Sequence, residues 1–79
     1  MEMKLKLIWD FYGEDAKPTA EHHVVHLKQF SEKENIPFFG AGIDSISEIH
    51  TIAYLIIDEK NMIPVRDALK PKRGERVEL

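Results

Sequence analysis

The sequence predicts one small α+β domain in which two helices cover one face of an antiparallel four-stranded sheet, in the order βαββαβ. Apolar residues alternate at period two over residues 4–12 and 50–58, as in strands, and recur at helical spacing over residues 19–35. Right-handed crossovers then place the two most apolar strands side by side in the centre of the sheet.

Residues 4–12 form the predicted first strand. One face is apolar and carries Leu5, Leu7, Trp9 and Phe11. The other face is mixed and carries Lys4, Lys6, Ile8, Asp10 and Tyr12.

A loop over 13–18 leads to the first predicted helix, from Thr19 to about Asn35. Thr19 is a candidate N-cap, and Asp15 or Pro18 could equally mark the start. Pro37 favours an end before it. A second strand is expected over 38–43, where two glycines suit an edge with a bulge, followed by a turn over 44–48.

The third predicted strand, residues 50–58, is apolar on both faces and organises the domain. Ile52, Tyr54 and Ile56 lie on one face, and Ala53, Leu55 and Ile57 on the other. A short helix over 62–69 and a charged edge strand over 75–79 complete the chain.

This order of elements is that of a ferredoxin-like fold. Both helices must lie against one face of the sheet, which carries Leu5, Leu7, Trp9, Phe11, Ala53, Leu55 and Ile57. The opposite face is left bare, and it carries Ile8, Asp10, Tyr12, His50, Ile52, Tyr54 and Ile56. We expect this face to be too apolar for water and to be buried by a second copy of the chain, which forms a homodimer. At 79 residues, a chain buries only about 60 % of its unfolded surface, and dimerisation is one remedy.

Composition narrows the class of protein. Cysteine is absent, which excludes disulfides and thiolate metal sites, and the net charge of −3 gives no general case for nucleic acid or membrane partners. The chain has no apolar run long enough to span a membrane and no signal-peptide core near its start, so a cytoplasmic location is expected.

The run His22-His23-Val24-Val25-His26-Leu27, followed by Phe38-Phe39-Gly40-Ala41-Gly42, is loosely similar to small YCII-like proteins of the dimeric α+β barrel superfamily. In that superfamily ferredoxin-like subunits pair their sheets. The resemblance implies a small-molecule ligand and a homodimer. No cofactor is expected, because short loops leave little room for haem.

His22 and His26 lie four residues apart on the first helix and could bind a metal, although most exposed histidines only solvate a surface. His23 borders the apolar stripe. It is either a histidine at the margin of the core with a backbone hydrogen-bond partner or part of a cleft between helix and sheet.

Asp10, Tyr12, His50 and Tyr54 form the second candidate site on the bare face. We take Asp10 and His50, with His23, as candidate catalytic residues for acid/base chemistry, and Tyr12, Tyr54 and Trp9 as ligand-binding residues. The alternative is that these groups only hydrogen-bond across the dimer interface. A slip of strand parity would move His50 and Tyr54 to the helix side.

The basic residues Lys72 and Arg73, with Lys70, Arg66 and Arg76 nearby, could hold a phosphate or carboxylate, or could be solvated turn residues. The predicted function is therefore small-ligand binding by a homodimer, with cofactor-free acid/base chemistry as one option. A non-catalytic dimerising or ligand-sensing module and a metal-binding protein are the alternatives, and the sequence does not decide whether the chain is an enzyme.

Overall fold

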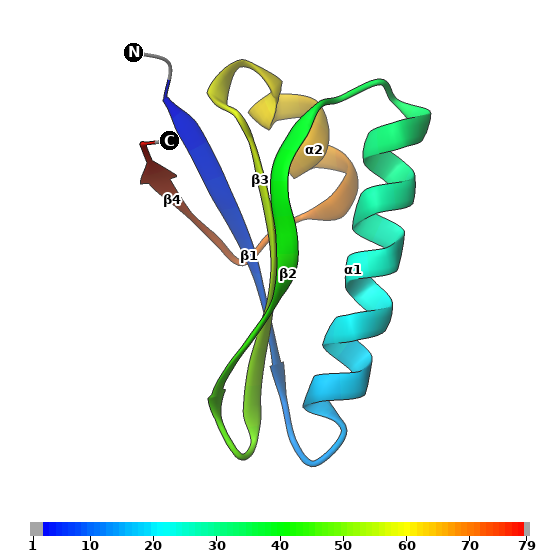
Figure 1. Ribbon diagram of the computed structural model, residues 1–79, viewed down its shortest axis with the longest axis vertical. Helices are drawn as coiled ribbons and strands as arrows, with labels where there is room; N and C mark the ends of the chain where they lie inside the picture. The colour runs from blue at the N-terminus through cyan, green and yellow to red at the C-terminus, as the bar shows by residue number, and fades with distance from the viewer. Residues whose placement is uncertain (1–2, 79) are drawn as a thin grey trace.

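The computed structural model describes residues 3–78 as an α+β domain with a four-stranded antiparallel sheet and two α-helices (Figure 1). The elements follow the predicted order. They are β1 (Lys4–Tyr12), α1 (Ala16–Lys33), β2 (Phe38–Ser47), β3 (His50–Asp58), the 3-10 turn η1 (Glu59–Asn61), α2 (Met62–Leu69) and β4 (Arg73–Val77).

The strands lie in the order β2-β3-β1-β4, and all three pairs are antiparallel. The two most apolar strands therefore occupy the centre, as predicted, and the strands with glycine and charge lie at the edges. The β2–β3 register shifts between Phe38 and Gly40 and again between Ser45 and Ser47, which confirms an irregular edge strand.

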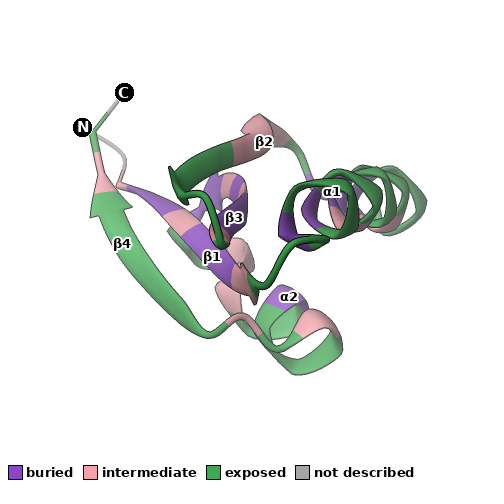
Figure 2. Cartoon of the chain, turned by 90° about the horizontal axis from the view of Figure 1, so that it is seen from below, coloured by how far each residue is buried: buried purple, intermediate pink, exposed green. Residues whose placement is uncertain are grey.

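Both helices pack on one face of the sheet (Figure 2). The core joins that face to the apolar stripes of α1 and α2, and its buried members are Leu5, Leu7, Trp9, Ala20, Val24, Leu27, Ile36, Ala53, Leu55, Ile57 and Val65. The predicted assignment of side chains to the helix face is thus confirmed for β1 and β3.

Several predicted boundaries are wrong. The α1 helix begins at Ala16 with Asp15 as N-cap, so of the three predicted starts Asp15 is confirmed and Thr19 is wrong. Pro18 lies in the first turn of the helix, where no backbone N–H is needed. It ends at Lys33, and Asn35 has a positive φ of 56°.

Two strand predictions also need correction. Residues 44–47 continue β2, because they pair with β3 up to a tight turn at Glu48 and Ile49. The β4 strand begins at Arg73 and not at Glu75, since Arg73 pairs with Ile8. The predicted end of this strand, Leu79, lies outside the described residues.

The face opposite the helices, here called the open face, is less apolar than the sequence suggests. Ile8 is only 2 % exposed and Ile52 only 4 % exposed within a single chain. Lys6 lies over the ring of Tyr54, with its Nζ 4.6 Å from the ring centroid, and Lys4 lies over Phe39 at 4.3 Å. The expectation that a second copy of the chain must cover this face because it is apolar is therefore wrong for Ile8 and Ile52, which are already buried.

A buried ion pair closes one end of the central strand pair. Lys4 Nζ lies 2.6 Å from Asp58 Oδ1, and these residues are direct partners in the β1–β3 register.

No helix of residues 3–78 is long and apolar enough to cross a membrane.

Candidate functional site

The open face carries an aspartate–histidine pair. His50 Nε2 donates to Asp10 Oδ1 at 2.8 Å, and the two side chains are 19 % and 14 % exposed. The β1–β3 register explains the contact, because Tyr12 is paired with His50 and Asp10 lies two residues away on the same face. The predicted parity of His50 is confirmed.

Two further side chains complete this group, here called the Asp10 site. The ring of Tyr12 stacks on that of His50, with centroids 4.3 Å apart and planes 17° apart. Arg73 at the start of β4 donates from Nη2 to Asp10 Oδ1 at 3.2 Å. The carboxylate of Asp10 therefore joins side chains from β1, β3 and β4.

The geometry of the Asp10 site selects a histidine tautomer. A carboxylate is only an acceptor, so Asp10 holds the proton of His50 on Nε2 and leaves Nδ1 as an acceptor or base. Stacking on Tyr12 fixes the plane of the ring. The arrangement can orient a neutral imidazole for proton transfer.

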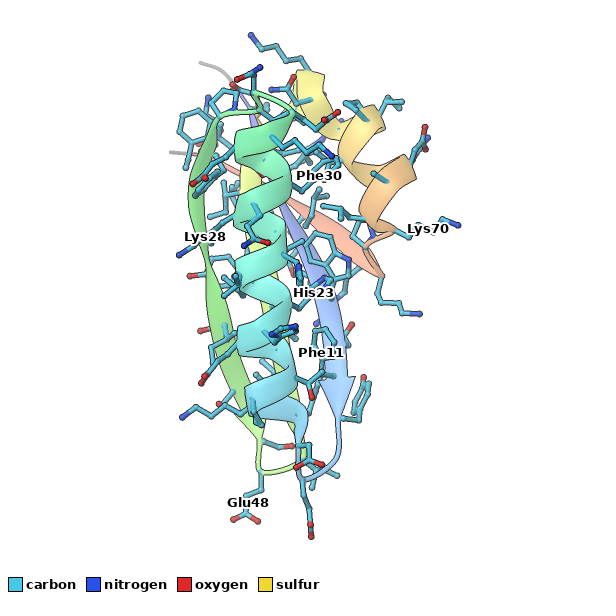
Figure 3. The ribbon with its side chains drawn as sticks, turned by 90° about the vertical axis from the view of Figure 1, so that its right-hand side faces the viewer. Phe11, His23, Lys28, Phe30, Glu48 and Lys70 are labelled. Atoms are coloured by element: carbon cyan, nitrogen blue, oxygen red, sulfur yellow. The ribbon has the colours of Figure 1, made fainter. Side chains whose placement is uncertain are left out.

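His23 and Trp9 lie on the opposite face of the sheet from the Asp10 site. The ring of His23 packs edge-on against Trp9 at 5.2 Å and Phe11 at 5.4 Å, between α1 and β1 (Figure 3). Trp9 Nε1 donates to the backbone oxygen of Leu69, at the end of α2, at 2.8 Å. Neither residue joins Asp10 and His50.

Burial lowers the pKa of His23, and the nearby His26 and His22 act in the same direction. Nε2 of His23 is buried and has no hydrogen-bond partner among the described residues. Its aromatic packing agrees with the interpretation of His23 as a histidine at the margin of the core, but the backbone partner expected for Nε2 is absent among the described residues.

Tyr54 shares the open face but has other neighbours. Its ring lies across Gly42, where an added Cβ would stand 3.0 Å from the hydroxyl oxygen, and the ammonium of Lys6 covers the ring. The glycine in β2 thus makes room for the close approach of the tyrosine, and a larger residue there would have to displace its hydroxyl. Tyr54 therefore packs against Gly42 and Lys6, whereas Asp10 and His50 contact each other.

His22 and His26 contact each other on the exposed side of α1, with their Nε2 atoms 3.0 Å apart. The predicted i, i+4 pairing is therefore present. Among residues 3–78 there is no group of three or more His, Cys, Asp or Glu side chains that could hold a metal ion. A metal bound between His22 and His26 would therefore have only these two histidines as ligands from residues 3–78.

The main hollows of the surface do not coincide with the predicted site. A hollow of about 350 Å³ lies between α2 and β4, and two others lie at the α1–β2 connection and beside η1. None of these three is lined by Asp10, His23 or His50. The pocket expected between the first strand and first helix is occupied at His23 by its packing with Trp9 and Phe11.

Of the predicted anion-binding pair, Arg73 lines the α2–β4 hollow and Lys72 does not. We did not predict the contact between Arg73 and Asp10. The alternation of side chains along the last strand would have indicated it. Once Arg73 pairs with Ile8, its side chain must lie on the open face beside Asp10.

No family model, curated protein or solved structure matches this chain.

Proposed function

We propose that this chain is a ferredoxin-like protein that binds a small organic ligand at the Asp10 site and forms a homodimer through its open face, as a dimeric α+β barrel. The observation that carries the proposal is the 2.8 Å contact between His50 Nε2 and Asp10 Oδ1 on a sheet face that neither helix covers. The resemblance to YCII-like proteins and the cytoplasmic location remain expectations from the sequence.

The chemistry we propose is proton transfer at Nδ1 of His50. Asp10 orients the imidazole through the hydrogen bond at Nε2, as a carboxylate does behind a general base. Arg73 pairs with Asp10 through Nη2 and is half-exposed, so its other N–H groups can bind an anionic ligand beside the site, and Tyr12 supplies a flat surface for an unsaturated one. These roles require no cofactor.

The dimer gives this site an enclosure that a single chain lacks. The small size of the domain supports it, because apolar burial within one chain of this length gives only marginal stability. Ile56 and Tyr54 keep partial exposure on the open face, while Ile8 and Ile52 are already buried. The apolar gain on pairing is therefore smaller than the sequence alone suggests.

The alternative function is a non-catalytic module in which Asp10 only links neighbouring strands through hydrogen bonds. One observation favours it: a single carboxylate oxygen accepts from both His50 and Arg73 and so links three strands. In that case the group contributes to stability alone, and no ligand contacts it.

Fragment screening by amide chemical-shift mapping separates these two functions. Under our proposal, small heteroaromatic or carboxylate fragments shift the amides of Asp10, Tyr12 and His50, and the shifts disappear in His50→Gln. Lys28→Gln, on the exposed side of α1, is the control that retains them. Shifts that never include these three residues would refute the ligand site and leave the module.

Sedimentation equilibrium tests the dimer independently. We expect a species of twice the 9.2 kDa chain mass. A stable monomer at micromolar concentration would refute the barrel while leaving the histidine chemistry open to the mapping experiment.

A further inference from the structure

The hollow between α2 and β4 is the second feature of this chain that suggests a ligand, and it shares only Arg73 with the Asp10 site. Its volume of about 350 Å³ is at the small end of ligand pockets, which range over roughly 300–1,000 Å³. It lies on the helix side of the sheet, where β4 extends away from α1 (Figure 2).

The floor of this hollow is apolar. Leu5 and Leu7 of β1 form it together with Met62 of α2 and Pro71. Gly74 keeps it open: this residue pairs with Leu7, and a Cβ added at Gly74 would stand 3.3 Å from Leu7 Cδ2. A larger side chain at position 74 would therefore occupy the space that the glycine leaves.

The rim of the hollow is cationic. Arg66 of α2 and Arg76 of β4 line it from opposite elements, and their side chains are 54 % and 70 % exposed. Arg76 contacts Glu59 through Nε at 3.4 Å, so its terminal amino groups are the ones that can face a bidentate acceptor. Arg66 lies 3.6 Å from Asp67, and such exposed pairs yield readily to a better acceptor.

We propose that the hollow binds a small aliphatic carboxylate, with its hydrocarbon part on Leu5, Leu7 and Met62 and its carboxylate between Arg66 and Arg76. An apolar floor selects the hydrocarbon part, and planar guanidinium groups match a carboxylate better than ammonium groups do. This site shares Arg73 with the Asp10 site, but it uses neither Asp10 nor His50, so it does not rest on the proposed function.

Titration of the full chain with hexanoate, followed by amide chemical shifts, tests the proposal. We expect saturable shifts at Leu7, Met62 and Gly74. Hexan-1-ol, which has a hydrocarbon part without the charge, and inorganic phosphate, which has charge without a hydrocarbon part, should each bind at least 10-fold more weakly than hexanoate. Binding of hexan-1-ol or of phosphate as tight as that of hexanoate would overturn the proposal, because it requires both parts of the ligand.

Two variants locate the site. Arg66→Gln/Arg76→Gln should weaken hexanoate binding at least 10-fold, whereas Lys28→Gln/Lys33→Gln, with the same charge change on the exposed side of α1, should leave it within twofold. Gly74→Val should also abolish binding while keeping both arginines, and its amide spectrum shows whether it is folded. Unchanged affinity in the arginine variant, or shifts that lie away from the hollow, would overturn the assignment.

His50→Gln distinguishes failure here from failure of the proposed function. Hexanoate binding should be unaffected by this change if the hollow is the site. Loss of hexanoate binding in His50→Gln would assign the ligand to the open face and overturn the present inference.

Discussion

The contact between Asp10 and His50 can be measured as a coupling free energy. Both side chains are mostly buried, at 14 % and 19 % exposed, and the acceptor is charged. A hydrogen bond to a charged group contributes about 1.5–3 kcal/mol to stability, and we expect a coupling of that size. By contrast, the Arg73 side chain is 51 % exposed, so its coupling to Asp10 should be only about 0–1 kcal/mol.

Two double-mutant cycles compare these couplings. The first combines Asp10→Ala with His50→Ala, and the second combines Asp10→Ala with Arg73→Ala, with free energies of unfolding taken from urea titrations at pH 7 and one protein concentration. The cycle removes effects of each truncation that do not depend on the partner. An Asp10–His50 coupling no larger than the Asp10–Arg73 coupling would refute the assignment of Asp10 and His50 as the stronger, part-buried pair.

Three further predictions concern other residues. Burial lowers the pKa of His23 below its usual value of about 6.5, so as pH falls through that value the unfolded chain binds a proton first and the free energy of unfolding decreases. His23→Phe should reduce this loss between pH 7.5 and 5.5 in urea titrations, and an unchanged loss would contradict the assignment. Gly42→Ala should destabilise the chain by about 1–3 kcal/mol through overpacking against Tyr54, as measured by thermal unfolding, and should be nearly neutral in a Tyr54→Leu background. Zinc or nickel added after chelator treatment should bind to the histidine pair of α1 and fail to bind to His26→Ala in calorimetry, whereas equal binding would exclude that pair.

The parts of the fold that follow from local periodicity were predictable. Period-two alternation fixes which side chains of β1 and β3 share a face, and this is why Asp10, Tyr12 and His50 were expected together and lie together. The same parity placed Tyr54 on that face. Parity does not specify the side-chain direction, however, and Tyr54 extends over Gly42 rather than toward His50.

Features that depend on pairing between distant segments were not predictable. Residues 44–47 are mostly polar and have the composition of a turn, yet they form a strand because β3 supplies hydrogen-bonding partners. Arg73 and Gly74 follow a helix stop and have the composition of a loop, but they pair with β1. For this reason the sequence did not place Arg73 beside Asp10, and it did not reveal the hollow that Gly74 keeps open.

The polar pairs at the two ends of β1 and β3 select one alignment of these strands over the others. Sliding β3 by two residues would leave each side chain on its present face, so the apolar pattern alone permits more than one alignment. At one end Lys4 would then lose Asp58 as its cross-strand partner, and at the other Tyr12 would lose His50. Leaving a buried ammonium without its carboxylate is costly. The charged groups thus discriminate against misaligned pairings of β1 with β3 that the hydrophobic core by itself would tolerate.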